Sequence, residues 1–176
     1  MLAALTGWGQ EEDRRRTAEA GFDHHFVKPP EPNALNDLLT ELTYRKQPPR
    51  RFLVVEDNVG AAKILSILIS KTGAHQVEMA HDGPSAIAKA ETFCPEIILL
   101  DIGLPRMDGY AVARRLRENE ACRSTLLVAL TGHGADEDRQ KSSEAGFDEH
   151  IVKPISIELL RQLLLHPKLD RSASQT

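Results

Sequence analysis

Apolar runs and polar segments alternate along the chain from residue 51 onward. The segments 51–55, 97–100, 126–130 and 151–152 are almost unbroken apolar runs, and each is followed by polar residues. Such runs are typical of strands buried on both faces of a parallel sheet. The segment 76–80 instead alternates apolar and polar residues, as a strand with one wetter face does. The pattern therefore predicts five strands.

Between and after these strands, apolar residues recur at helical spacing and predict helices. The predicted stripes are Ala61, Ile64, Leu65, Leu68 and Ile69; Ala86, Ala90 and Phe93; Val112, Ala113 and Leu116; and Ile157, Leu160 and Leu164. Ser156 is the expected N-cap of the last helix. The fourth helix, around 136–144, carries almost no apolar stripe. It is either a plainly solvated helix or one loose enough to shift when a nearby site changes charge.

Strand character also predicts the order of the sheet. The first, third and fourth strands are solidly apolar and should be central, whereas the alternating second strand and the short fifth strand suit the edges. With right-handed crossovers the order is 2-1-3-4-5, and a topological switch point lies between strands one and three. The expected fold class is α/β, a doubly wound five-stranded parallel sheet with helices on both faces.

An internal repeat organises the chain. Three motifs occur twice at one constant offset: Leu2–Gly7 and Leu127–Gly132, Glu19–Asp23 and Glu144–Asp148, and Val27–Pro29 and Val152–Pro154. The chain thus begins with the second half of a domain and then contains the same domain whole. We expect a partial copy of two strand-helix units at 1–43, a proline-rich linker at 44–50, a complete domain at 51–167 and a polar tail at 168–176. The simplest account is a tandem protein whose upstream part is missing from this sequence.

Composition limits the possible functions. The net charge of the 176 residues is −4, and no basic run or aromatic-basic stripe favours direct binding of nucleic acid. No apolar stretch approaches the roughly 20 residues of a membrane span, and no signal peptide is evident. Cys94 and Cys122 are widely separated, which favours reduced thiols and a cytoplasmic location. The seven histidines show no zinc-site spacing.

Polar side chains follow four of the predicted strands. They are the acidic pair Glu56 and Asp57, then Asp101, Thr131 and Lys153. Because the carboxyl ends of parallel strands share one edge of the sheet, we expect these groups to converge there. Carboxylates that converge repel one another unless a hard cation lies between them, and oxygen ligands alone favour Mg²⁺ or Mn²⁺.

This set of groups fits one reaction. Asp101 can attack a phosphoryl group in line and form an acyl phosphate. The metal, Lys153 and the Thr131 hydroxyl would then neutralise or hydrogen-bond the phosphoryl oxygens. Taken alone, Asp101 could also merely start a turn.

Four motifs carry a family resemblance: Val55–Asn58, Asp101–Pro105, Ala129–Gly132 and Val152–Pro154. In this order and spacing, over about 51–165, the sequence resembles response-regulator receiver domains. The sequence of residues 101–110, together with Gly146–Asp148, most resembles receivers at the C-terminus of hybrid sensor histidine kinases. The resemblance implies a flavodoxin-like fold and a phosphorelay function.

The resemblance also implies residue roles. Asp101 is the expected phosphoacceptor, Asp57 a direct Mg²⁺ ligand, Glu56 its partner through water, and the backbone carbonyl of Gly103 a further metal ligand. Thr131 is the expected switch hydroxyl and Lys153 the phosphate-pairing cation, with a cis peptide bond between Lys153 and Pro154.

Two positions depart from the family pattern. The strand-five position that usually holds an aromatic switch residue is His150, and His25 is its equivalent in the partial copy. Arg106 follows Asp101 in a loop where a small residue is commoner. The partial copy keeps Thr6 and Lys28 but has no acidic pair and no phosphoacceptor, so we expect no phosphoryl chemistry from it.

The resemblance implies partners and leaves rival functions. The expected donor is a sensor histidine kinase or a histidine phosphotransfer domain, and a downstream protein that reads the phosphorylated state is a further candidate partner. The module is not expected to be an enzyme beyond catalysing its own phosphorylation and dephosphorylation. One rival is a phosphorylation-independent binding module. The other, a Mg²⁺-dependent phosphatase with an aspartyl nucleophile, is disfavoured because Gly103 stands where such hydrolases carry a second acid.

Overall fold

A computed structural model describes residues 3–7, 15–16, 19–22, 24–29, 47–132 and 136–171. The chain divides into two compact units, Met1–Lys46 and Gln47–Thr176. The end of the partial copy after Pro29, residues 44–46 of the predicted linker and residues 172–176 of the predicted tail lie outside the described residues.

The larger unit is built on a five-stranded parallel sheet. Its strands are β3 (Arg51–Val55), β4 (Gln76–Ala80), β5 (Ile97–Asp101), β6 (Leu126–Thr131) and β7 (Glu149–Val152). Their order in space is β4-β3-β5-β6-β7, so the predicted order 2-1-3-4-5 is confirmed. The fold is the expected doubly wound, flavodoxin-like α/β fold.

The helices of this unit follow the strands in alternation. They are α3 (Val59–Ser70), α4 (Gly83–Phe93), α5 (Gly109–Glu118), α6 (Asp136–Glu144), α7 (Ile157–Leu164) and the short α8 (Pro167–Arg171), with one turn of 3₁₀ helix at Glu120–Cys122. Side chains of Asn58, Asp82, Asp108 and the predicted Ser156 cap four of them by accepting a backbone N–H three residues later. Within the described ranges, no helix is both long and apolar enough to cross a membrane.

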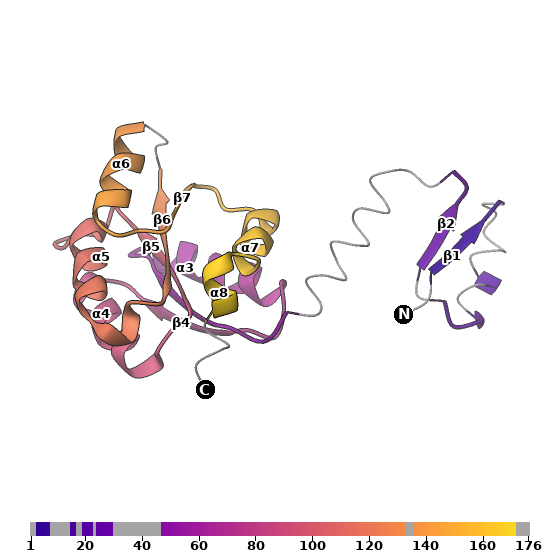
Figure 1. Ribbon diagram of the computed structural model, residues 1–176, viewed down its shortest axis with the longest axis horizontal. Helices are drawn as coiled ribbons and strands as arrows, with labels where there is room; N and C mark the ends of the chain where they lie inside the picture. The colour runs from indigo at the N-terminus through magenta and orange to yellow at the C-terminus, as the bar shows by residue number, and fades with distance from the viewer. Residues whose placement is uncertain are drawn as a thin grey trace. The chain divides into compact units, whose positions relative to one another are not determined.

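Two hydrophobic cores cover the two faces of the sheet. Alternate strand residues supply them: Phe52 and Val54 face one core, and Leu53 and Val55 face the other. The first core is completed by α3, α7 and α8, and the second by α4 and α5, which lie on opposite sides of the sheet in Figure 1. Every residue of β5 and β6 is buried, because these central strands have packed helices on both faces.

Two details differ from the prediction. In α3 the buried stripe is Ala62, Leu65 and Ile69, whereas Ile64 is 61% exposed. The predicted stripe was too wide, since α3 packs on the sheet along a narrower face. The domain also continues past residue 167: α8 follows, and its Leu169 is 2% exposed within the first core. The predicted start of the polar tail, at residue 168, therefore lies too early in the chain.

The smaller unit contains a two-stranded parallel sheet of β1 (Ala3–Thr6) and β2 (His24–Val27). Ala3 pairs with His24, just as Val128 pairs with Glu149 in the larger unit. Both partners are offset by 125 residues (128 − 3 and 149 − 24), so the register of β1 and β2 repeats that of β6 and β7.

Candidate functional site

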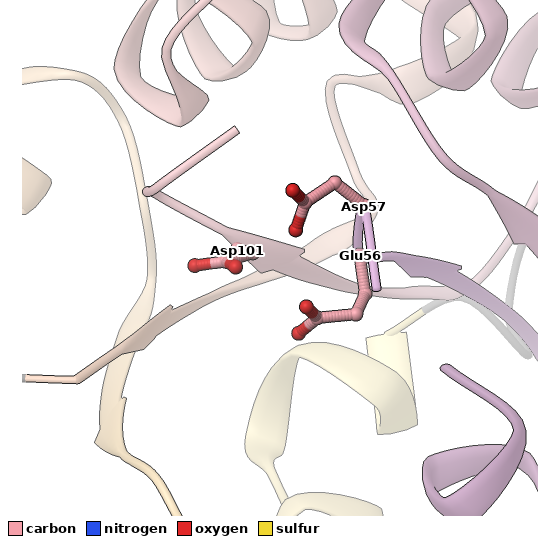
Figure 2. A group of neighbouring side chains, drawn as sticks. All are labelled: Glu56, Asp57 and Asp101. Atoms are coloured by element: carbon pink, nitrogen blue, oxygen red, sulfur yellow. The ribbon is translucent and has the colours of Figure 1, made fainter. Parts of the chain in front are cut away.

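Three carboxylates converge at the carboxyl edge of the sheet. Glu56 and Asp57 directly follow β3, and Asp101 is the last residue of the neighbouring β5. Val55 pairs with Leu100, so the parallel register brings the acidic pair and Asp101 to the same level. Ligand oxygens of the three side chains all lie within 4.8 Å of one another. Figure 2 shows Glu56 and Asp57 on one strand end, with their carboxylates directed toward Asp101.

The three acids differ in exposure. Glu56 is 3% exposed and Asp101 is 8% exposed, whereas Asp57 is open to solvent. The backbone around them is fixed by sheet-like hydrogen bonds, from Glu56 N–H to the carbonyl of Ala80 (3.1 Å) and from Ile102 N–H to that of Leu130 (3.0 Å). Burying carboxylates is costly unless a cation or hydrogen-bond donors accompany them.

Lys153 supplies one such cation. Its ammonium donates to Oε2 of Glu56 at 2.6 Å and to Oδ2 of Asp101 at 2.8 Å, from the end of β7. Burial by itself lowers the pKa of Lys153. The hydrogen bonds and charges of Asp101 and Glu56 together outweigh burial and raise the pKa above its ordinary value. Lys153 is therefore charged at neutral pH, and it links the two buried acids.

The loop after Asp101 folds tightly back onto this strand end. Gly103 N–H donates to Oδ1 of Asp101 at 3.0 Å, and Gly109 N–H donates to the carbonyl of Ile102 at 3.1 Å. A Cβ at Gly109 would lie 2.5 Å from the carbonyl oxygen of Asp101, so only glycine fits there. Arg106, within the loop, has a left-handed φ of 70°. The Gly103 amide thus contacts the phosphoacceptor candidate, and its carbonyl remains a predicted metal ligand.

Thr131 ends β6 beside this site and is 5% exposed. Its carbonyl accepts the N–H of Lys153 at 2.8 Å, so the hydroxyl-bearing and the ammonium-bearing strand ends are joined. The peptide bond between Lys153 and Pro154 is cis, as the resemblance implied, and so is that between Lys28 and Pro29. The structure thus brings together Glu56, Asp57, Asp101 and Lys153, with Thr131 on the adjoining strand end.

A divalent cation fits the charge of this cluster. Three carboxylates and the Lys153 ammonium leave two formal negative charges, and the candidate ligand atoms are all oxygen. Hard cations such as Mg²⁺ and Mn²⁺ prefer such oxygen donors. Among the described residues, Glu56, Asp57 and Asp101 are the cluster that could hold a metal ion.

An apolar surface beside the acids was not predicted. Val59, Ile64 and Ile67 of α3 are 49%, 61% and 57% exposed. Of these three, Ile64 borders a cavity of about 240 Å³, which is lined by Glu56, Ala61, Ile64, Leu65, Leu68, Lys153, Pro154 and Ile155. The signal was in the sequence, because α3 has more apolar residues than one helix face can bury. We call Val59, Ile64 and Ile67 the α3 surface.

Comparison with known proteins identifies the family. The sequence model of the response regulator receiver domain matches residues 52–165. This chain therefore belongs to the response regulator receiver domain family.

Several relatives are similar over large parts of the chain. The transcriptional regulatory protein TrcR of Mycobacterium tuberculosis is 37% identical over 112 residues, which cover 64% of this chain and 42% of that protein. The signal transduction histidine-protein kinase BarA of Shigella flexneri is 29% identical over 159 residues, 84% of this chain but 17% of that protein. The chain spans about half of the length of the curated relatives it matches first.

Solved receiver domains share the fold. The receiver domain of the sensor histidine kinase PA1611 from Pseudomonas aeruginosa is 30% identical, with a TM-score of 0.61 over 66% of this chain and 95% of that one. That structure has a magnesium ion coordinated in its active site cleft. The chemotaxis protein CheY4 of Vibrio cholerae is 27% identical, with a TM-score of 0.63 over 67% of this chain and 98% of that one.

Proposed function

We propose that Asp101 is the phosphoacceptor of a two-component phosphorelay and takes a phosphoryl group from a phosphohistidine donor. The observation that carries the proposal is the convergence of Glu56, Asp57 and Asp101, with the Lys153 ammonium bonded to two of them. The module catalyses its own phosphorylation and dephosphorylation and turns over no separate substrate. Its proposed location is the cytoplasm.

In the proposed reaction, a carboxylate oxygen of Asp101 attacks the phosphorus atom in line with the P–N bond of the phosphohistidine. A P–O bond forms and the P–N bond breaks. The imidazole leaves with the bonding electron pair and takes up a proton. The product is an acyl phosphate on Asp101.

Two strand-end residues are proposed to act on the transferred group. Lys153 already pairs with Asp101, so its ammonium is placed to neutralise a phosphoryl oxygen once the Asp101 carboxylate is phosphorylated. Thr131 is the proposed switch residue, whose hydroxyl hydrogen-bonds a phosphoryl oxygen and pulls the end of β6 toward the site. Lys153 and Thr131 already share a backbone hydrogen bond, which would couple their movements.

The proposed cofactor is Mg²⁺ or Mn²⁺. Glu56, Asp57 and Asp101 are its proposed side-chain ligands, with Glu56 acting through water, and the backbone carbonyl of Gly103 is a further ligand. When bound, such an ion neutralises the acids and the incoming phosphoryl oxygens. The exposed Asp57 carboxylate offers the ion a route into the cluster from solvent.

The α3 surface is the proposed docking site for the protein that carries the phosphohistidine. Its Ile64 lines the 240 Å³ cavity together with Glu56 and Lys153, so a protein bound there would lie next to the acids. Exposed apolar side chains that cluster next to a polar site favour a protein partner. Ile64→Glu should slow transfer from a phosphorylated histidine phosphotransfer domain that labels the wild-type chain. Labelling by a small phosphodonor should be unchanged, since the acids are untouched.

Incubation with acetyl phosphate and Mg²⁺, followed by intact-mass measurement, tests the proposed chemistry. A single phosphate adduct is expected, and it should be absent in Asp101→Asn and when EDTA removes the divalent ion. Asp108→Asn is the matched control, because this exposed carboxylate caps α5 at the other end of the same loop.

The other outcomes identify the rival functions. Release of inorganic phosphate from acetyl phosphate without any adduct would favour a Mg²⁺-dependent phosphatase. Absence of any reaction would favour a phosphorylation-independent binding module. A full adduct in Asp101→Asn would overturn the assignment of the phosphoacceptor.

A further inference from the structure

Helix α6 is held to the rest of the fold by little apolar burial. Its described side chains are those of residues 139–144, and among them Ser142 is the buried one, at 2% exposed. Arg139, Gln140 and Lys141 are all open to solvent. Helices in proteins owe most of their stability to a packed apolar face, so α6 needs another source of stability.

A polar contact from the buried position of α6 reaches the sheet. The hydroxyl of Ser142 lies 3.1 Å from Nδ1 of His150, on the neighbouring edge strand β7. His150 is half-buried, and its backbone pairs with Ala129 of β6. A hydroxyl can donate or accept, so this hydrogen bond can form with either tautomer of the imidazole.

The chain just beyond α6 is firmly anchored. Ala145 and Phe147 are buried in the second core, and Phe147 N–H donates to the carbonyl of Ser142 at 3.0 Å. Asp148 accepts hydrogen bonds from Arg117 (2.6 Å) and from the backbone N–H of Leu127 (2.8 Å). Among the described side chains of α6, Ser142 is the buried one. Its contact with His150 therefore lies closest to this anchor.

We propose that the Ser142–His150 hydrogen bond is a latch that holds α6 on β7, and that opening it releases the helix while the sheet stays folded. In the unlatched state Phe147 keeps its burial in the second core and Asp148 keeps its hydrogen bonds to Arg117 and Leu127, because these contacts do not involve α6. The bond lies at the position where receivers usually carry an aromatic residue. This chain thus joins helix and strand there by a hydrogen bond between two polar side chains.

Amide hydrogen exchange of the whole chain, without any phosphodonor, tests the latch. Ser142→Ala should speed exchange in α6 by about 5- to 20-fold, because a buried hydrogen bond is lost and Nδ1 of His150 loses this partner. Exchange in β3, β5 and β6 should be unchanged. Trypsin should also cut faster after Arg139 and Lys141, which lie within the released helix.

Ser143→Ala is the matched control. Ser143 is the exposed neighbour of Ser142 on the same helix, and alanine raises helix propensity equally at both positions. Exchange in α6 should therefore be unchanged or slower in Ser143→Ala and faster only in Ser142→Ala. Ser142→Thr, which keeps the hydroxyl, should exchange more slowly than Ser142→Ala.

Three results would overturn the latch. One is equal exchange in Ser142→Ala and Ser143→Ala. Another is loosening of the central strands together with α6, which would show global destabilisation. The third is a further effect of Ser142→Ala on exchange in α6 when His150→Phe has already removed the partner, because the latch predicts no further effect. Because no phosphoryl chemistry enters the test, its outcome is independent of the proposed function.

Discussion

The ammonium of Lys153 lies 2.8 Å from Oδ2 of Asp101, although 52 residues separate them in the sequence. The same nitrogen lies 2.6 Å from Oε2 of Glu56. Lys153 therefore occupies carboxylate oxygens that a divalent cation would also use. Its ammonium offsets the charge of these two acids, and it would compete for them with the proposed metal ion.

Lys153→Met should separate these two effects. Mg²⁺ affinity should rise by about three- to tenfold, because removing the ammonium leaves the three carboxylates without their internal cation. Labelling by acetyl phosphate at saturating Mg²⁺ should nevertheless fall by about 100-fold, because a preorganised charge at the phosphoryl group is lost. Calorimetric titration with Mg²⁺ and intact-mass time courses measure the two quantities.

The control for this prediction is Lys71→Met. Lys71 is the exposed C-cap of α3, and the variant changes the net charge equally. Its Mg²⁺ affinity and labelling rate should match those of the wild type. Weaker Mg²⁺ binding in Lys153→Met would show that Lys153 organises the acids for the metal and does not compete with it.

His75 should make stability depend on pH. Its Nδ1 accepts the N–H of Arg50 at 3.1 Å, and its ring contacts Phe52 edge-on. Burial first, and then the charge of Arg50, lower the pKa of His75 below its ordinary value. The unfolded chain therefore binds the proton more readily. The free energy of unfolding should fall as the pH drops below about 6.5, until the folded-state pKa is passed.

Urea unfolding at pH 8, 6 and 5 measures this effect against His75→Asn. Asparagine keeps an acceptor near the Nδ1 position but does not titrate. The variant should be less stable than the wild type at pH 8, because the ring contact is lost. Its loss of stability between pH 8 and 5 should be smaller than that of the wild type. Equal losses in the two proteins would exclude His75 as the source.

The fold could be predicted from the sequence because its strongest signals are local. The apolar runs 97–100 and 126–130 are buried on both faces, so their pattern alone identifies central strands. The candidate acids end such strands, and the parallel sheet brings them to one edge. Asp101 and Glu56 were found in this way before any contact was known.

Other features depend on how the elements pack. Helical spacing shows which residues of α3 share a face, but the rotation of the helix against the sheet decides that Ile64 is exposed. Helix α8 is too short for periodicity to reveal, and of residues 167–170 Leu169 is the buried one. Two side-chain contacts also depend on packing. Lys153 bonds Glu56 as well as Asp101, and Ser142 bonds His150. No local sequence pattern encodes the side-chain geometry of these contacts.

Arg106→Gly should stabilise the larger unit. The φ of Arg106 is 70°, a conformation that costs an L-residue roughly 1 kcal/mol and glycine almost nothing. Part of this gain is offset by the greater entropy of glycine in the unfolded chain, so the unfolding free energy should rise by about 0.5 kcal/mol. Urea unfolding measures it. Arg106→Ala removes the same side chain but keeps Cβ, so it should give no gain, and an equal gain would assign the effect to the lost guanidinium.

Deleting residues 1–46 should leave phosphorylation of Asp101 unchanged. All five proposed side chains of the site lie in the unit Gln47–Thr176. The smaller unit repeats the register of β6 and β7, and it has Thr6 and Lys28, but no counterpart of Glu56, Asp57 or Asp101. A parallel pair of strands is only marginally stable without neighbours, so the deletion should also reduce self-association. Intact-mass labelling rates and sedimentation of both chains test these statements. Labelling that slowed several-fold, with the larger unit still folded, would show that the first 46 residues act in the phosphoryl chemistry after all.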